Sequence, residues 1–113
     1  ALYLHGEHHA VIYKELGQVQ NTGYFIDNTL FYPGDALTNP NKPVDILALP
    51  VAGPWMKISE AIEYALLLKP KKVFPVHDAI LSIPSIGTMH LAKILPPEGI
   101  EFIPLNAGEE KEF

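Results

Sequence analysis

Three short segments of the sequence place a side chain that can bind a metal ion beside a glycine or a proline. These segments are HGEHHA, YPGDALT and PVHDA, and their candidate ligands are His5, His8, His9, Asp35 and His77. Imidazole and carboxylate ligands without sulfur are typical of catalytic zinc sites and of iron and manganese sites. Positions 9, 35 and 77 are 26 and 42 residues apart, so only folding could bring them together. The residue types alone leave a second interpretation open, in which the histidines are ordinary hydrogen-bonded residues and the aspartate belongs to a turn.

The segment KKVFPVHDA, residues 71–79, indicates where one of these side chains would lie. Pro75 has no N–H group to give to a strand ladder, so the ladder is expected to end there. His77 would then lie just beyond the carboxyl end of a strand. In open α/β sheets, ligands bind at the carboxyl ends of the strands. The sequence therefore places His77 in a position suited to a binding site.

The composition excludes several kinds of protein. The chain has 113 residues, 48% of them hydrophobic and 19% charged, as expected for one globular domain or half-domain over residues 1–113. Its net charge of −5 argues against nucleic acid as a main partner. The absence of cysteine excludes disulfides, thiolate metal sites and a cysteine nucleophile. No apolar run approaches about 18 residues and no signal pattern opens the chain, so we expect no membrane partner and a cytoplasmic location.

The order of apolar segments predicts an α/β fold with a mixed β-sheet. We expect strands over residues 1–5, 10–16, 44–50, 72–76 and 100–105, and helices over residues 59–69 and about 86–95. Alternation of strands and helices in the second half favours parallel pairing. In the first half, Asp27 and Asn28 separate two aromatic runs and predict a hairpin, which pairs its strands antiparallel.

The helix at 59–69 is the clearest single element in the sequence. Ser59 is expected to cap its amino end, and Pro70 is expected to stop it. Apolar residues recur at helical spacing and should pack on the sheet, namely Ile58, Ile62, Ala65 and Leu66. Loss of the Ile62 side chain should then cost about 2–5 kcal/mol if the position is buried.

The amino-acid sequence of these segments, in this order, resembles that of a known family. The ordered set GEHHAVIY, NTGYFIDNTLFYPGDALT and PVDILALPVAGPWMKISEAIEYALLLKPKKVFPVHD is similar to the C-terminal half of metallo-β-lactamase-fold hydrolases. The resemblance extends over roughly residues 4 to 110. It implies a mixed sheet with helices on one face, as in one half of an αββα sandwich.

The resemblance also implies roles for three residues. His9 matches a histidine that binds one metal ion, Asp35 matches the aspartate that bridges two ions, and His77 matches a histidine that binds the second ion. Asp35 would also be the catalytic residue of this chain. The implied cofactor is two zinc ions, with manganese or iron as alternatives, and the implied reaction is metal-dependent hydrolysis of a small-molecule substrate. His8 is the alternative to His9.

One feature of the family is missing from this sequence. The family's first metal motif, His-x-His-x-Asp-His, occurs in the N-terminal half of a domain about twice this length, and no such string is present here. We therefore expect the chain to be half of a metallo-hydrolase, to begin inside a fold, and to be inactive alone. Its partner would be the missing N-terminal half or a second copy of the chain. The alternative function is a non-catalytic half-domain or assembly module that binds a protein.

Other polar and aromatic residues have two interpretations each. Trp55 could line a substrate cleft or cover the core beside the following helix. Asp78 could orient His77 or cap a turn. His90 is expected at the surface or the edge of the core, and His5 is a weak candidate ligand inside the first strand. Tyr32 is expected to pack in the core or on a sheet face.

Overall fold

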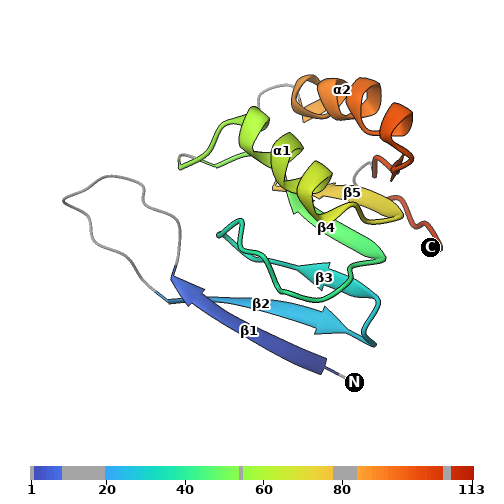
Figure 1. Ribbon diagram of the computed structural model, residues 1–113. Coiled ribbons are helices and arrows are strands. Elements are labelled where there is room, and N and C mark those ends of the chain that lie inside the picture. The colour runs from blue at the N-terminus through green and yellow to red at the C-terminus, as the bar shows by residue number, and fades with distance from the viewer. Residues whose placement is uncertain (1, 9–19, 54, 78–83, 106–107) are drawn as a thin grey trace.

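The computed structural model describes residues 2–8, 20–53, 55–77, 84–105 and 108–113 (Figure 1). Six strands of the described part form one sheet in the order β1-β2-β3-β4-β5-β6. The strands are β1 Leu2–His8, β2 Gln20–Ile26, β3 Leu30–Tyr32, β4 Ile46–Pro50, β5 Lys72–Val76 and β6 Glu101–Phe102. The pairs β1·β2 and β2·β3 are antiparallel, and the remaining three pairs are parallel. The mixed sheet predicted from the sequence is confirmed.

The described residues also form two α-helices and a short 3₁₀ helix. They are α1 Ile58–Leu68, α2 Pro84–Ile94 and η2 Pro96–Glu98. Figure 1 shows α1 and α2 on the same side of the sheet, in front of the strands from β4 onward. The predicted α/β class with helices on one face is therefore confirmed. In the described part of the chain, no helix is long and apolar enough to cross a membrane.

The hairpin between β2 and β3 forms at the predicted position. Asp27 and Asn28 adopt φ angles of 52° and 54°, in the left-handed region. Short polar side chains tolerate this region better than other residues, and two such residues in sequence give a turn whose twist matches that of the strands. The turn sets the register in which Ile26 lies opposite Leu30 and Tyr24 opposite Tyr32.

β4 and β5 each carry a proline at or near the carboxyl end, Pro50 and Pro75. β5 continues through Pro75 to Val76, and the Val51 N–H donates to the Val76 carbonyl at 3.0 Å. In β5, the backbone N–H and C=O groups of successive residues point alternately toward β4 and toward β6. The backbone nitrogen of Pro75 therefore points toward β6, which has already ended at Phe102. β5 therefore ends one residue after Pro75, and His77 lies just beyond its carboxyl end, as predicted; the Pro75 nitrogen has no N–H and points where no partner strand remains. Pro50 has the equivalent position in β4, on the side of β3, which ends at Tyr32.

Helix α1 begins one residue earlier than predicted, and Ser59 is not its cap. The N-cap is Lys57, whose backbone N–H donates to Oε1 of Glu60 at 2.7 Å. This bond satisfies the amino end from within the first turn, where Ser59 lies exposed. The carboxyl end closes at Lys69, which has a φ of 47° and donates its N–H to the Ala65 carbonyl at 3.0 Å.

The buried face of α1 is also turned relative to the prediction. Its buried residues are Ala61, Tyr64 and Ala65, of which Ala65 was predicted, while the predicted Ile58, Ile62 and Leu66 are half-buried and pack against the core. The Tyr64 hydroxyl donates to the Thr38 carbonyl. Tyr64 can therefore occupy the buried face, because its polar end has a partner there.

β1 is longer than predicted at its carboxyl end. The segment Gly6–His8 was expected to separate two strands, but it pairs with residues 20–22 of β2 as part of β1. The second expected strand, over residues 10–16, lies outside the described residues. The last strand is shorter than predicted, since β6 covers only Glu101–Phe102.

The two faces of the sheet differ in burial. We call the face toward the helices the inner face, and its strand residues are fully buried: Phe25, Phe31, Leu47, Leu49 and Val73. They pack with Ala61, Tyr64, Ala65, Leu91 and Leu95 in one core. The opposite face, which we call the outer face, carries the cross-strand neighbours Tyr24, Ile26, Leu30, Tyr32, Ile46, Phe74 and Val76. Tyr24 and Ile26 on the outer face are 39% and 47% exposed.

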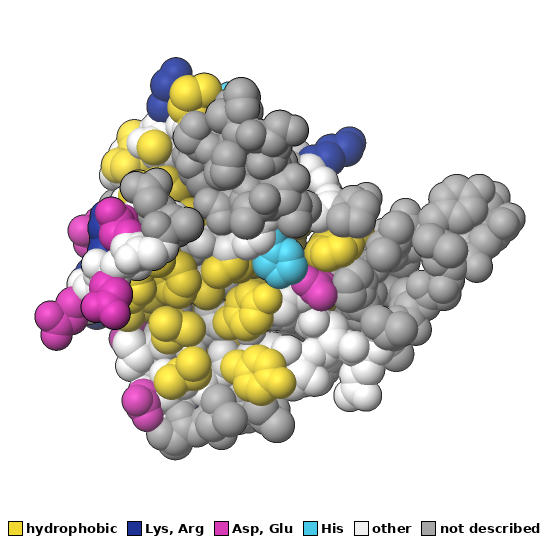
Figure 2. All heavy atoms as spheres, turned by 180° about the vertical axis from the view of Figure 1, so that it is seen from behind, with side chains coloured by type: hydrophobic (Ala, Val, Ile, Leu, Met, Phe, Trp, Pro, Cys, Tyr) yellow, Lys and Arg dark blue, Asp and Glu magenta, His cyan; other side chains and the backbone are white. Residues whose placement is uncertain are grey.

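Figure 2 views the molecule from the side opposite to Figure 1 and shows hydrophobic side chains gathered over the sheet beside a histidine and an acidic side chain. The carboxyl-terminal segment covers part of this outer face. The Phe113 ring stacks on Phe74 with centroids 5.0 Å apart. Lys72 Nζ donates to the Phe113 carbonyl at 3.2 Å.

Candidate metal centre

The structure brings together two of the three predicted ligands. Asp35 follows β3 and His77 follows β5, and the Asp35 Oδ1 atom lies 3.4 Å from the His77 Nε2 atom. Both side chains are partly accessible, at 34% and 28% exposure. The two positions are 42 residues apart in the sequence, so their contact is a product of the fold.

The backbone also brings the end of β1 to this edge of the sheet. β1 and β3 are both antiparallel to β2, and β3 is parallel to β4 and β5. The carboxyl ends of β1, β3, β4 and β5 therefore meet at one edge, as expected for strands that share a direction. His8 is the last residue of β1. His9 lies outside the described residues, and the side chains of His5 and His8 are not described.

His77 has an unusual backbone and two aromatic neighbours. Its φ is 68°, in the left-handed region, so the chain turns sharply as it leaves β5. The Tyr32 hydroxyl lies 3.2 Å from His77 Nε2, the same nitrogen that faces Asp35. The Trp55 ring meets the imidazole edge-on, with centroids 6.3 Å apart. Trp55 therefore lies beside the candidate site.

The phenol of Tyr32 stays protonated at neutral pH. Burial, and secondly the charge of the nearby Asp35, raise the pKa of Tyr32 above its ordinary value. Both effects disfavour the phenolate. The protonated hydroxyl can therefore donate to His77 Nε2 when that nitrogen carries neither a proton nor a metal ion.

The Asp35 loop is held by Asn21 of β2. The Asn21 Nδ2 atom donates to the Pro33 carbonyl at 2.8 Å, and the Asp35 N–H donates to Asn21 Oδ1 at 2.9 Å. Between them, Gly34 has a φ of 77°, a conformation that favours glycine. These bonds fix the backbone at the point where it presents the Asp35 carboxylate.

Sequence reasoning missed two residues of this site. Tyr32 was expected to serve packing alone, and its sequence signal is only its alternation with Phe31, which puts it on the outer face. Asn21 carried no expectation, although a polar residue that alternates with apolar positions in a strand is a usable signal. Of the remaining histidines, His90 is exposed on α2, as predicted. Asp78 lies outside the described residues.

The geometry fits a shared metal ion. A neutral N–H···O hydrogen bond has a usual donor–acceptor distance of about 2.9 Å, whereas two ligands at about 2.0–2.1 Å from one tetrahedral zinc ion lie about 3.3 Å apart. The observed 3.4 Å between Asp35 Oδ1 and His77 Nε2 is close to the second value. In the described part of the chain, no group of three His, Cys, Asp or Glu residues is placed to hold a metal ion. A third ligand would come from a residue whose side chain is not described, or from another chain or segment.

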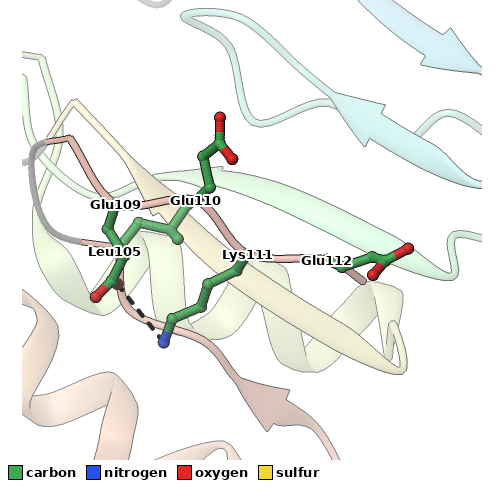
Figure 3. Close-up of a pocket in the computed structure, with 5 residues that line it drawn as sticks. All are labelled: Leu105, Glu109, Glu110, Lys111 and Glu112. Atoms are coloured by element: carbon green, nitrogen blue, oxygen red, sulfur yellow. Dashed lines mark ion pairs between the residues drawn. The ribbon is translucent and has the colours of Figure 1, made fainter.

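An open depression elsewhere on the surface is unrelated to this centre. Its volume is about 640 Å³, and it lies along the carboxyl-terminal segment (Figure 3). Its lining residues are Leu105, Glu109, Glu110, Lys111 and Glu112. Lys111 pairs with Glu109 at 3.7 Å. This depression contains neither Asp35 nor His77.

Comparison with known proteins identifies the family. A family profile described as "Beta-lactamase superfamily domain" matches residues 4–77, a segment that includes His9 and Asp35 and ends on His77. The chain belongs to the β-lactamase superfamily. Protein Rv0786c of Mycobacterium tuberculosis is 43% identical to it over 79 residues, which are 66% of this chain and 37% of that protein.

A solved structure shows the same fold as this β-lactamase superfamily chain. Igni18, a metallo hydrolase from the hyperthermophilic archaeon Ignicoccus hospitalis, aligns with a TM-score of 0.63 at 19% identity. The alignment covers 96% of this chain and 51% of Igni18. The predicted metallo-β-lactamase fold is therefore confirmed, and the family is of the hydrolase type. The chain spans about half the length of Igni18 and 37% of the length of Rv0786c.

Proposed function

We propose that this chain supplies part of the dinuclear zinc site of a metal-dependent hydrolase that acts on a small-molecule substrate. The proposed ligands are His9 for one ion, Asp35 as the bridge between two ions, and His77 for the second ion. The observation that carries the proposal is the 3.4 Å approach of Asp35 Oδ1 to His77 Nε2 at the edge where the strands end. The superfamily of the chain supports it independently.

Each side chain has a chemical reason for its proposed role. A carboxylate offers two oxygens and can bridge two cations, which suits Asp35. A neutral imidazole offers one nitrogen, which for His77 is the Nε2 atom that faces Asp35. When bound, the metal ions would polarise the scissile group and activate a water molecule for attack. Tyr32 and Trp55 flank the site: the Tyr32 hydroxyl lies 3.2 Å from His77 Nε2, and the Trp55 ring lies edge-on to the imidazole.

We further propose that a second layer covers the outer face. This layer would be an N-terminal half of the fold or a second copy of the chain, and it would supply the remaining ligands. Two observations support it: the apolar outer face with its exposed Tyr24 and Ile26, and the 51% of Igni18 that the chain spans. Exposed apolar patches of this kind are typical of interaction surfaces. The chain alone would then be inactive.

The test is metal binding and hydrolysis by the complete protein. Wild-type protein should retain zinc through dialysis and hydrolyse at least one member of a panel of esters, lactones, thioesters and phosphodiesters. Asp35→Ala and His77→Ala should reduce zinc content and lower the rate by at least about 100-fold, because each removes a ligand. Asp45→Ala is the control, because the Asp45 side chain is 49% exposed and its Oδ1 atom makes only a long ion pair with Lys71 Nζ, at 3.8 Å. Full activity in Asp35→Ala would contradict the proposal.

A non-catalytic assembly module is the second candidate function, and the apolar outer face favours it. The two candidates differ in one measurable respect. A module would bind its protein partner equally well with Asp35→Ala, and it would hydrolyse nothing in the presence of zinc. A hydrolase would lose activity with Asp35→Ala and keep its assembly.

A further inference from the structure

Asn21 is unusual among the described side chains, because it is the one polar residue in that part of the chain that is buried, at 8% exposure. Burial of an amide without hydrogen bonds costs several kcal/mol, on the order of 2–7 depending on the reference state. A buried asparagine therefore needs partners, and its partners show what it holds.

Both ends of the Asn21 amide are occupied by the backbone of one loop. Nδ2 donates to the Pro33 carbonyl at 2.8 Å, and Oδ1 accepts from the Asp35 N–H at 2.9 Å. A carbonyl can only accept and an N–H can only donate, so the two partners fix which end of the amide is which. The amide spans Gly34 and clamps the residues on either side of it.

The position of Asn21 explains why a side chain performs this task. In the β2·β3 register, Tyr24 lies opposite Tyr32, and continuation of that register would place Asn21 opposite Asp35. The ladder stops at Tyr32 because Pro33 has no N–H and Gly34 turns away with a φ of 77°. The Asn21 side chain thus replaces the backbone pairing that β3 has lost.

Contact with Gly34 makes the clamp tight. A Cβ atom added to Gly34 would meet Asn21 Oδ1 and Cγ closer than van der Waals contact allows. The loop can therefore lie against the amide only because residue 34 is glycine. Asp35 follows directly, and its carboxylate reaches His77 Nε2 at 3.4 Å.

We infer that Asn21 is a positioning residue, which sets the direction of the Asp35 carboxylate toward the metal site. This inference rests on the proposed function of Asp35 as a metal ligand. Residues that orient a ligand from behind typically change metal affinity by about 10–100-fold when they are removed. An amide suits this position better than a carboxylate, because a carboxylate cannot donate to the Pro33 carbonyl.

The experiment compares Asn21 with a chemically matched control. Asn21→Ala removes both bonds, and Asn21→Asp keeps the acceptor for the Asp35 N–H but loses the donor to Pro33. Asn39→Ala is the control, because Asn39 Oδ1 also accepts a backbone N–H, from Asn41 at 2.8 Å, on an exposed loop. Two quantities are measured on the complete protein: the zinc dissociation constant by competition with a chromophoric chelator, and the hydrogen-exchange rate of the Asp35 amide without metal.

The expected result is zinc affinity about 10–100-fold weaker for Asn21→Ala, a smaller loss for Asn21→Asp, and no change for Asn39→Ala. The Asp35 amide should exchange at least about tenfold faster in Asn21→Ala than in the wild type. If Asn21→Ala does not fold, Asn21→Asp carries the comparison.

The outcomes separate this inference from the proposed function. Wild-type zinc affinity in both folded Asn21 variants would overturn the positioning role and leave the metal site intact. If the wild type itself binds no zinc, the proposed function fails, and the exchange rate then tests only whether Asn21 holds the Asp35 loop. An unchanged exchange rate of the Asp35 amide in the folded variants would show that Asn21 does not hold it.

Discussion

The inner and outer faces of the sheet are built from alternate residues of the same strands, yet they differ in what covers them. Phe25, Phe31 and Leu47 on the inner face are completely buried beneath the helices. Tyr24 and Ile26, which flank Phe25 in the sequence, are 39% and 47% exposed on the outer face. Because both faces are apolar, hydrophobicity alone does not distinguish them. The difference teaches that the helices complete one side of the core and leave the other available for a second layer.

Truncation of the inner face should give the largest loss of stability. Leu47→Ala removes a fully buried side chain from the centre of the core, and we expect the free energy of unfolding to fall by about 2–5 kcal/mol. Ile26→Ala on the outer face should change it by less than about 0.5 kcal/mol in the isolated chain. Urea unfolding of both variants measures the contrast. Equal losses would show that the two faces are equally covered.

Association of the chain should depend on the outer face. We expect the chain to sediment as an assembly, with itself or with an N-terminal half, because the exposed apolar side chains favour a partner. Ile26→Asp should weaken that assembly, since a charge would have to be desolvated at the contact. Sedimentation velocity at micromolar concentration provides the measurement. A monodisperse wild-type monomer would contradict the expectation.

Truncation of a side chain at the edge of the core should cost less stability than truncation at its centre. Ile62 on α1 is half-buried, so Ile62→Ala should lower the free energy of unfolding by about 1–2 kcal/mol, less than for a fully buried residue. The comparison with Leu47→Ala is made in the same urea series. A loss as large as that of Leu47→Ala would show that Ile62 lies at the centre of the core.

The smallest expected change in stability is the one that alkaline pH causes through the buried hydroxyl of Tyr64. Burial raises the pKa of Tyr64 above its ordinary value of 10.0. The unfolded chain releases this proton near pH 10 and the folded chain retains it to higher pH, so stability is unaffected below about pH 10 and falls above it. In Tyr64→Phe the fall should be less steep, with about 1 kcal/mol lost at neutral pH from the missing bond to the Thr38 carbonyl. Thermal unfolding from pH 8 to 11 tests this, with Tyr24→Phe on the outer face as the control.

The sequence predicted much of the fold because its signals are local. The hairpin follows from Asp27 and Asn28, the parallel half follows from alternating strands and a helix, and the position of His77 follows from the end of β5. The approach of Asp35 to His77 was expected only through the resemblance to a family, since no local pattern relates residues 42 positions apart.

The features that the sequence did not predict depend on which residues of neighbouring strands lie opposite one another. Asn21 clamps Asp35 because the β2·β3 register places it opposite that residue, and this register is set by the hairpin turn rather than by Asn21 itself. Tyr32 reaches His77 across β4 for a similar reason. The buried face of α1 was misjudged because Tyr64 is polar at its tip, and only the fold shows the Thr38 carbonyl that accepts its hydrogen bond. Whether His9 joins Asp35 and His77 stays a prediction.

The two prolines inside the sheet have a consequence for how such a protein can change during evolution. Pro50 and Pro75 each face the side on which the neighbouring strand has already ended. On that side neither residue can donate a ladder hydrogen bond, because proline has no N–H to give. A change of sequence after either proline therefore cannot lengthen the sheet through these two positions on that side.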